Sequence, residues 1–335
     1  MDKKIIFEVK DLCKYYPAGH GKMLTAVDHV SFEVYEGETL GLVGESGCGK
    51  TTCGRTAIGL YKKDSGKVYY FGKDVDLFSK NEKKEYTKEV QMIFQDPYAS
   101  LDSKVKVQDI IAEGMDIHHM TRDKDKRRHR VEKLLEQVGL DKSYLNSYVN
   151  TFSGGQRQRI GIARALAVNP KFIVCDEPIS ALDVSVQAQI VNLLKKLQKE
   201  RNISYLFIAH DLAMVKYISD RIAVMYMGSI VEIAEAEALY DHAYHPYTQL
   251  LISAIPIPDP EVEENRKDEF SDFGLTSEFT CCGCRFADRC KESKDICYKE
   301  KPKLKQIVSG HFVPVICIGK LEEKMERGMY YHFKL

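Results

Sequence analysis

With 335 residues, the chain is long enough to form one large domain or two. Lys and Arg together number 49, as do Asp and Glu, so the net charge is zero and no overall basic field attracts nucleic acid. No apolar run approaches the length of about 18 residues that spans a membrane, and no long apolar segment follows the first four residues. We therefore expect a soluble, cytoplasmic chain that reaches a membrane only through partners.

Short strands joined by turns are predicted for the first part of the chain. Residues 5–9 and 30–34 have the pattern of strands, and residues 17–21 are typical of a turn. Residues 39–43 form a short apolar run, as a buried strand does. A further strand is predicted at residues 67–71.

A phosphate-binding loop is predicted directly after strand 39–43, where the chain matches the pattern G-x-x-x-x-G-K-[ST]. Its glycines allow backbone N–H groups to surround a phosphate, and a helix beginning near Thr51 adds the positive end of its dipole. Lys50 can reach the β- and γ-phosphates, and the Thr51 hydroxyl can bind Mg²⁺. The sequence thus predicts a site for a nucleoside triphosphate. Its residues are Gly44, Glu45, Ser46, Gly47, Cys48, Gly49, Lys50, Thr51 and Thr52.

The central part of the chain predicts helices and then an α/β pattern. Apolar residues at helical spacing make residues 105–150 mainly helical. From residue 160, apolar strands alternate with helices, which is typical of a parallel sheet covered on both faces. The predicted strands are 172–175, 204–209 and 222–226, with helices at 160–168 and 185–200.

Two acidic residues, Asp176 and Glu177, come directly after the apolar strand 172–175. Ligands of open α/β sheets collect at such strand ends. Asp176 can hold Mg²⁺, directly or through water, and Glu177 can accept the proton of an attacking water. A surface Asp-Glu pair is the alternative for the dipeptide alone, but its place in this chain favours catalysis.

A second anion site is predicted where Ser153, Gly154, Gly155 and Gln156 open a helix. The two glycines expose backbone N–H groups, and Ser153 is a good N-cap. One nucleotide needs only one such loop. We therefore expect this second loop to meet the nucleotide of another subunit.

These motifs resemble those of the ABC ATPases, in the order that family has them, over residues 1 to about 240. Residues 153–159 resemble the signature motif, and residues 180–183 resemble the D-loop, whose Asp183 is implied to bind nucleotide. The resemblance implies that Tyr16 stacks on adenine, although neighbouring Tyr15 is an alternative. It also implies that Gln95 senses Mg²⁺ and the γ-phosphate and that His210 contacts the γ-phosphate, although His210 alone has the pattern of a core histidine.

The resemblance also implies an architecture. Residues 1–240 are expected to form the nucleotide-binding domain, which has a RecA-like parallel sheet core and an N-terminal antiparallel β subdomain. Its helical signature subdomain is expected at about 96–155. Residues 241–335 are expected to form a C-terminal region with a small Cys-rich domain, whose metal-binding segment is 281–317.

Within the ABC ATPases, the chain resembles the oligopeptide/dipeptide permease subunits of the F type. Residues 28–50, 94–101 and 245–256 carry this likeness, with Asp102 in place of the usual Asn. The resemblance implies a subunit at the cytoplasmic face of the membrane that hydrolyses ATP with Mg²⁺ to power peptide import. Its expected partners are a second ATPase, either a D-type paralogue or itself, two transmembrane permeases and an extracytoplasmic binding protein. Nickel or another small solute is an alternative cargo, and a soluble ABC ATPase acting on ribosomes or DNA an alternative role.

Six of the ten cysteines lie in the last fifth of the chain. In a cytosolic protein such a group indicates metal before disulfides. Cys284, Cys290, Cys297 and Cys317 match the four family cysteines, which implies a 4Fe–4S cluster. Zinc is the alternative, because Cys281 and Cys282 add a C-x-x-C pattern, and a cap without metal is a third.

Overall fold

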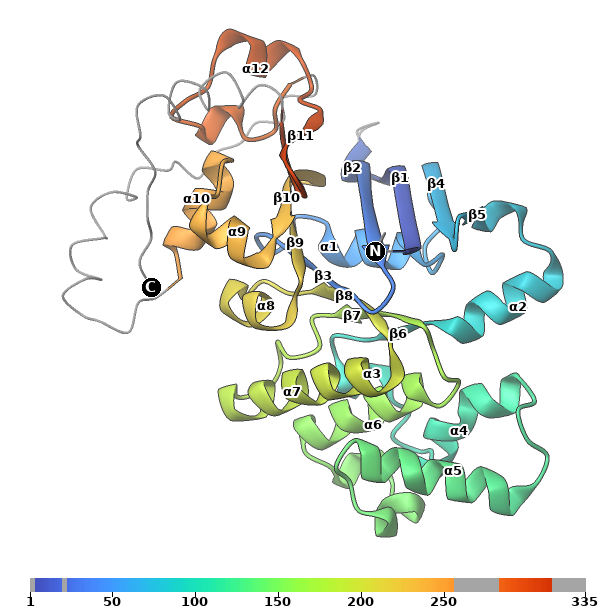
Figure 1. Ribbon diagram of the computed structural model, residues 1–335. Coiled ribbons are helices and arrows are strands. Elements are labelled where there is room, and N and C mark those ends of the chain that lie inside the picture. The colour runs from blue at the N-terminus through green and yellow to red at the C-terminus, as the bar shows by residue number, and fades with distance from the viewer. Residues whose placement is uncertain (1–3, 20–22, 256–282, 315–335) are drawn as a thin grey trace.

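The computed structural model describes residues 4–19, 23–255 and 283–314. These residues form two β-sheets with helices between and around them, and a helical lobe that extends away from the sheets (Figure 1). In this described part, no helix has both the length and the apolar character needed to cross a bilayer.

The smaller sheet is antiparallel, with strand order β2-β1-β4-β5. Its strands are β1 (Ile5–Pro17), β2 (Met23–Tyr35), β4 (Ser65–Tyr70) and β5 (Lys73–Asp74). Phe7, Val9 and Leu12 of β1 are buried, so one face of this sheet packs against the rest of the molecule. The predicted strands in this region and the antiparallel β subdomain are confirmed.

The larger sheet has eight strands in the order β11-β12-β10-β9-β3-β8-β7-β6. The five strands from β9 to β6 are parallel, whereas β10, β12 and β11 are added antiparallel. Every residue of β3, β7, β8 and β9 is buried, which explains why these segments are continuous apolar runs. The bounds are β3 (Thr39–Val43), β6 (Val90–Ile93), β7 (Phe172–Asp176), β8 (Ser204–Ile208), β9 (Arg221–Tyr226), β10 (Ser229–Glu235), β11 (Leu304–Val308) and β12 (His311–Pro314).

Helices cover both faces of the larger sheet. Helix α1 (Lys50–Ala57) contacts strands of both sheets, and the rings of Phe7 and Phe172 stack between the sheets with centroids 4.5 Å apart. The other face is covered by α7 (Val184–Arg201) and α8 (Leu212–Ile218), whose buried residues share one core with the helical lobe. The predicted parallel sheet with two covered faces is therefore confirmed.

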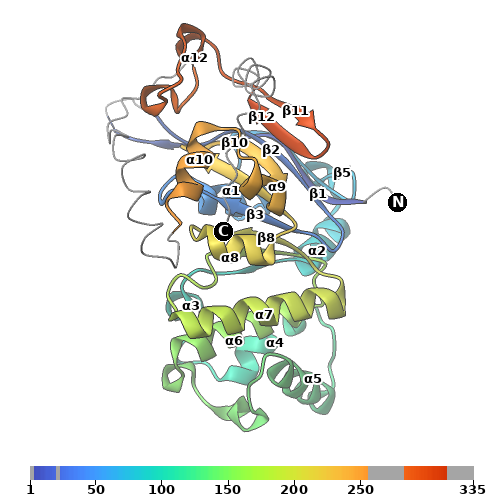
Figure 2. The same cartoon turned by 60° about the vertical axis from the view of Figure 1, so that its left-hand side comes forward.

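The helical lobe follows strand β6 and lies at the opposite end of the molecule from the C-terminal segments (Figure 2). Its core contains buried apolar residues of α4 and α5, among them Val131, Leu134 and Leu135, which repeat at helical spacing. Its elements are α3 (Pro97–Ser100), α4 (Val107–Ile117), α5 (Lys124–Gln137), the 3₁₀ helices η2 (Lys142–Asn146) and η3 (Val149–Thr151), and α6 (Gly154–Leu166).

Helix α2 (Lys80–Glu89) was not predicted, because it buries no residue and so has no apolar stripe. Its start does carry a sequence signal. Ser79 and Glu82 form a capping box, in which each side chain bonds the other's backbone amide. The helix follows the 3₁₀ helix η1 (Val75–Leu77).

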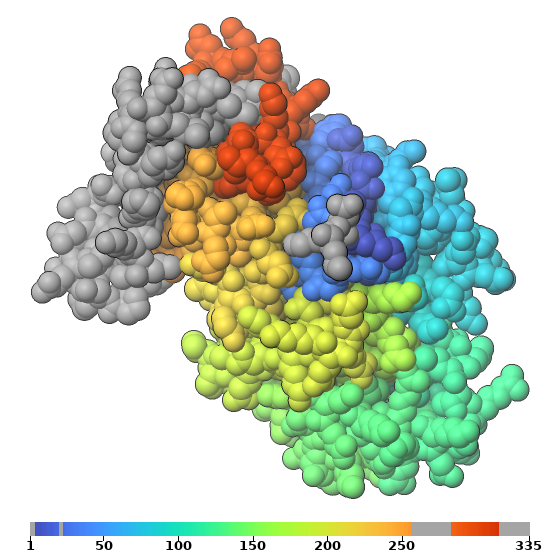
Figure 3. All heavy atoms as spheres, viewed as in Figure 1, coloured from blue at the N-terminus to red at the C-terminus, as the bar shows by residue number. Residues whose placement is uncertain are grey.

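The C-terminal module, defined as residues 283–314, packs against the N-terminal strands (Figure 3) and, through Phe286, against Tyr247 of α10 (Pro246–Ser253), the helix that follows α9 (Ala236–Asp241). It contains η5 (Ala287–Arg289), α12 (Asp295–Lys299) and the β11–β12 hairpin. Strand β12 extends the larger sheet by pairing with β10. The predicted Cys281, Cys282 and Cys317 lie outside the described residues.

Candidate nucleotide-binding site

The turn from β3 into α1 is the predicted phosphate loop, residues 44–51. Two of its glycines are required by close backbone contacts. A Cβ at Gly44 would lie 2.1 Å from the Met225 carbonyl oxygen, and one at Gly49 would lie 2.1 Å from that of Ala26. Gly49 also has a φ of 105° at the N-cap of α1, where side chains are strained. The loop is therefore held between strands of the two sheets.

A cavity of about 340 Å³ opens beside this loop. Its lining includes Tyr16, residues 24–26, residues 47–52, Glu177 and Met227. Sequence reasoning predicted Tyr16, residues 47–52 and Glu177 for this site but gave no sign of the others. An aromatic ring thus lies at one side of the cavity and the loop at the other.

Lys50 of this loop is buried, with an exposure of 3%. Its Nζ donates to the carbonyl oxygens of Gly44 at 2.8 Å and Glu45 at 2.9 Å. The ammonium group therefore lies under the loop, where a phosphate bound by the loop would meet a positive charge.

Asp176, at the end of β7, is fully buried beneath α1. Its Oδ1 accepts from the Thr51 hydroxyl at 2.7 Å, and its Oδ2 accepts from Arg55 Nη2 at 3.0 Å. The guanidinium charge stabilises a carboxylate that would be costly to bury alone. The structure therefore brings together Thr51 and Asp176, two of the predicted Mg²⁺ ligands. Arg55 was missed because no sequence pattern links it to residue 176.

Glu177 lies close to two other predicted site residues, Gln95 and His210. Its Oε2 accepts from Gln95 Nε2 at 2.8 Å and lies 3.8 Å from His210 Nδ1. Its φ is 42°, an uncommon value for a residue with a side chain and one that occurs at functional sites. Glu177 also lines a second cavity of about 650 Å³, together with Ser46, Gln95 and His210. It thus connects the two cavities.

The second predicted anion loop lies on the helical lobe. Ser153 caps α6, as its sequence predicted, and also forms a capping box with Gln156. Asp183 caps α7 and accepts from the Val186 amide at 3.0 Å. Neither residues 153–156 nor Asp183 line the two cavities described above.

Three of the four cysteines predicted to bind metal are described. Burial, together with the neighbouring Cys297 and Cys290, raises the pKa of the Cys284 thiol to about 11, although hydrogen bonds from backbone amides lower it. The Lys294 amide donates to Cys297 Sγ at 3.4 Å. The three thiols therefore lie near one another, and amide donors point toward two of them.

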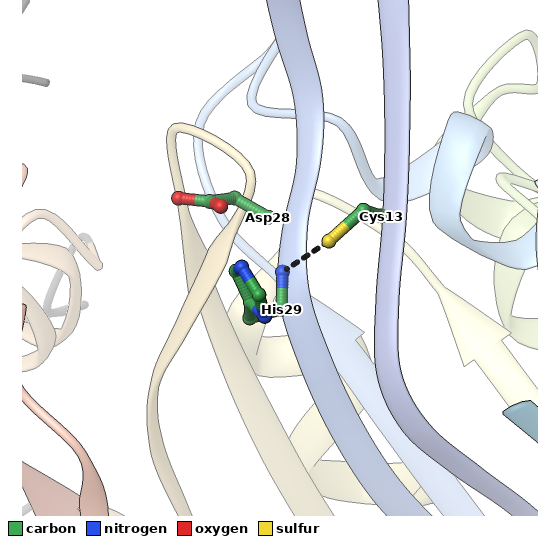
Figure 4. A group of neighbouring side chains, drawn as sticks. All are labelled: Cys13, Asp28 and His29. Carbon is green, nitrogen blue, oxygen red and sulfur yellow. Dashed lines mark hydrogen bonds between the residues drawn. The ribbon is translucent and has the colours of Figure 1, made fainter. Parts of the chain in front are cut away.

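A different group has the most closely spaced donors. Among the described residues, Cys13, Asp28 and His29 are the one set of three potential ligands within 4.8 Å of one another (Figure 4). The His29 amide donates to Cys13 Sγ at 3.3 Å. However, Arg285 and Lys301 both pair with Asp28, at 2.7 and 2.5 Å. Two cations on one carboxylate leave no negative charge for a metal ion, so this group does not fit a metal site.

Comparison with known families gives two matches along the chain. The ABC transporter family matches residues 27–180, and the oligopeptide/dipeptide transporter C-terminal region matches residues 231–297. The chain is 59% identical over 268 residues to the oligopeptide transport ATP-binding protein OppF of Bacillus subtilis, covering 79% of this chain and 87% of that protein. It is 53% identical over 267 residues to the dipeptide transport ATP-binding protein DppF of Lactococcus lactis, covering 79% and 86%.

Solved structures of ATP-binding cassettes share the fold. The dimeric cassette MJ0796, in a post-hydrolysis state with ADP and phosphate, has a TM-score of 0.63 at 27% identity and covers 69% of this chain and 99% of its own. CbiO1 from Clostridium perfringens, part of the transporter complex cbiONQ, has a TM-score of 0.62 at 26% identity and covers 72% and 92%.

The two-sheet fold and the phosphate loop, together with these matches, define an ATPase of the ABC class. Within that class, the chain belongs to the family of oligopeptide/dipeptide transport ATP-binding proteins. The predicted resemblance is confirmed.

The close contacts of the phosphate loop lead to a matched pair of variants. Gly49→Ala should weaken ATP binding by about tenfold or more, because its Cβ would overlap the Ala26 carbonyl at a φ of 105°. Gly59 has a φ of 87° but no atom within 4 Å of a Cβ, so Gly59→Ala should cost stability and leave ATP affinity unchanged. Fluorescence titration with nucleotide measures both, and equal affinities would contradict the steric argument.

Proposed function

We propose that this chain is the ATP-hydrolysing subunit that powers import of oligopeptides or dipeptides by an ABC transporter. The observation that carries this proposal is the arrangement of the predicted residues around two adjoining cavities. The phosphate loop and Asp176 lie there close to Glu177, Gln95 and His210. Relatives named as oligopeptide and dipeptide transport ATP-binding proteins support peptides as the cargo.

In this proposal, ATP occupies the cavity beside the phosphate loop. Tyr16 would pack against adenine, and the loop with Lys50 would hold the phosphates. Thr51 and Asp176 would hold Mg²⁺, with Gln95 completing its surroundings, and the ion would neutralise phosphate charge. The hydroxyl–carboxylate pair supports this assignment because hard oxygen donors suit Mg²⁺.

Hydrolysis needs a base near the attacking water, and Glu177 is placed for that role. Its carboxylate faces the cavity that it shares with Gln95 and His210. In the proposed mechanism, Glu177 would take the proton of the water, Gln95 would sense Mg²⁺ and the γ-phosphate, and His210 would contact the γ-phosphate.

Replacing Glu177 by Gln tests the assignment, because it keeps size and hydrogen bonding but removes the base. Turnover should fall by about 100-fold or more, while ATP is retained and the ATPase dimer stays closed. Steady-state phosphate release and gel filtration with ATP measure the two effects. Glu200→Gln, at the exposed end of α7, is the control and should behave as wild type. Near wild-type hydrolysis by Glu177→Gln would show that another group is the base.

The residues of the second anion loop, 153–156, and Asp183 are assigned to the nucleotide of a facing ATPase subunit, which is a second copy or a D-type paralogue. Their position away from this chain's own cavities supports the assignment. So does the capped N-terminus of α6, where free amides and the helix dipole favour an anion. The fold neighbour MJ0796 is described as a dimer.

Complementation tests the shared site. Ser153→Arg and Lys50→Ala should each abolish hydrolysis, because one blocks the second loop and the other removes the phosphate contact. A dimer containing one of each has one intact composite site, so a mixture should hydrolyse ATP faster than either variant alone. For a pair with the D-type paralogue, the two substitutions are placed on opposite subunits. Hydrolysis that Ser153→Arg leaves unchanged in every pairing would reject the composite site.

The permease subunits are assigned to a groove of about 560 Å³ between strand β6 and the helical lobe. Leu60 and Ile117 line it and are 54% and 63% exposed, so it offers apolar surface to a partner. Arg164 contacts the chain on both sides of Gln95. Its guanidinium lies 5.7 Å from the centre of the Phe94 ring and donates to the Ser100 carbonyl oxygen. A cytoplasmic permease segment seated here would place the chain at the inner membrane face. The extracytoplasmic binding protein would deliver peptide to the permeases.

The C-terminal module is assigned a 4Fe–4S cluster held by Cys284, Cys290, Cys297 and Cys317. The described thiols fit this group, since three of them lie near one another with amide donors toward two. Zinc, which thiolates bind at about 2.3 Å, is the alternative for the same residues. The cluster would supply folding energy to a small module.

Anaerobic purification tests this assignment. The protein should be brown, with broad absorption at about 400 nm from thiolate-to-iron charge transfer. Cys297→Ser should lose the colour, whereas Cys53→Ala, at a buried cysteine of α1, should keep it. Colourless protein with one equivalent of zinc would establish the rival metal, and protein without either metal would contradict both assignments.

A further inference from the structure

The second residue of the phosphate loop, Glu45, is held by residues from the C-terminal part of the chain. Its amide donates to the Tyr247 hydroxyl oxygen at 2.9 Å, and its carboxylate accepts from Arg289 Nη1 at 3.1 and 3.2 Å. Its carbonyl oxygen accepts from Lys50 Nζ at 2.9 Å. Each polar group of Glu45 therefore has a partner, and two of these partners, Tyr247 and Arg289, lie more than 200 residues away along the chain.

Both distant partners, Tyr247 and Arg289, pack against the same aromatic rings, those of Tyr226 and Phe286. Tyr247 of α10 is fully buried, and its ring lies 4.6 Å from Tyr226 and 5.5 Å from Phe286. Arg289 lies 5.7 Å from the rings of Tyr226 and Phe286 and also donates to the Tyr226 hydroxyl at 3.4 Å. Few rotamers remain open to side chains packed in this way, so they can fix the position of the loop.

A second contact joins the module to the same cavity. Arg285 donates to the carbonyl oxygen of Met227, a residue that lines the cavity beside the loop. Arg285 is itself fixed by Asp28 at 2.7 Å. Burial alone would raise the pKa of Asp28, but Lys301 and Arg285 outweigh it and lower the pKa, so this anchor stays charged at neutral pH.

The charges at Glu45 matter for a ligand as anionic as ATP. A carboxylate on the phosphate loop repels phosphates, and the repulsion grows with the charge of the nucleotide. Arg289 neutralises that carboxylate and draws it toward the module. Burial raises the pKa of the Tyr247 hydroxyl, so this group adds no negative charge of its own.

We propose that Tyr247 of α10 and Arg289 of the C-terminal module are positioning residues for nucleotide binding, and that Arg289 makes the module part of the ATP site. Tyr247 sets the backbone of the loop at Glu45, and Arg289 cancels the charge of the Glu45 side chain. The inference rests on the proposed binding of ATP phosphates by the loop 44–51.

The test is nucleotide affinity of the full-length protein, measured separately for MgATP and MgADP by displacement of a fluorescent ATP analogue. Arg289→Ala should raise the Kd for ATP by about threefold to tenfold and that for ADP by less, because an unpaired carboxylate repels the more anionic nucleotide more strongly. High salt should shrink the difference. Tyr247→Phe should weaken ATP and ADP equally, because it disturbs the backbone and not the charge.

Glu45→Gln separates positioning by charge from a purely structural ion pair. It should tighten ATP binding by about twofold to fourfold, since it removes the repulsive group and leaves Arg289 near the phosphates. A purely structural pair predicts the opposite sign, with both single variants weaker. Because Glu45 lies outside the module, this variant stays informative even if Arg289→Ala perturbs the fold of the module.

Two controls distinguish failure of this inference from failure of the proposed function. Arg128→Ala removes an Arg–Glu pair of 3.0 Å on α5, far from the loop, and should leave both affinities unchanged. Lys50→Ala should abolish ATP binding, and unchanged binding would reject the loop as the ATP site. With that control intact, three results each overturn the inference: weaker ATP binding by Glu45→Gln, wild-type affinities of Arg289→Ala and Tyr247→Phe, or an equal effect of Arg128→Ala.

Discussion

The close approach of the phosphate loop to two backbone carbonyls is the constraint on which the site depends. Gly44 lies against Met225 of the larger sheet, and Gly49 lies against Ala26 of the smaller sheet. The loop is therefore shaped by the spacing of the two sheets, which the stack of Phe7 on Phe172 helps to set. Packing between the two sheets thus decides whether the loop has a shape that can accept a phosphate.

Charge is arranged around that loop by pairing. The buried carboxylate of Asp176 pairs with Arg55 and accepts a hydrogen bond from Thr51. Arg55 thus compensates the carboxylate charge where solvent does not reach, and the carboxylate is placed to bind a cation. Glu177, one residue later, turns out of the sheet with a φ of 42° toward Gln95 and His210. Two adjacent acidic residues thereby have different surroundings, which is how one strand end can serve both metal binding and proton transfer.

The C-terminal module belongs to the ATPase structurally as well as by family match. Its strand β12 continues the sheet that carries the phosphate loop, and its His311 pairs with buried Glu232 of β10 at 2.7 Å. Its arginines reach the loop and the cavity wall. A metal-dependent module in this position would connect its own folding to the shape of the nucleotide site.

The sequence by itself determined the features that depend on neighbouring residues. These are the glycines of the phosphate loop, the buried strands, the acidic pair after β7 and the cap at Ser153, because backbone conformation and periodicity are local properties. The search for apolar patterns missed α2, which buries no residue. Tertiary structure alone decided which distant groups meet. Arg55 of α1 and Asp176 at the end of β7 are 121 residues apart, and Arg289 of η5 and Glu45 of the phosphate loop are 244 apart, so these pairs exist only because the folded chain brings separate elements together.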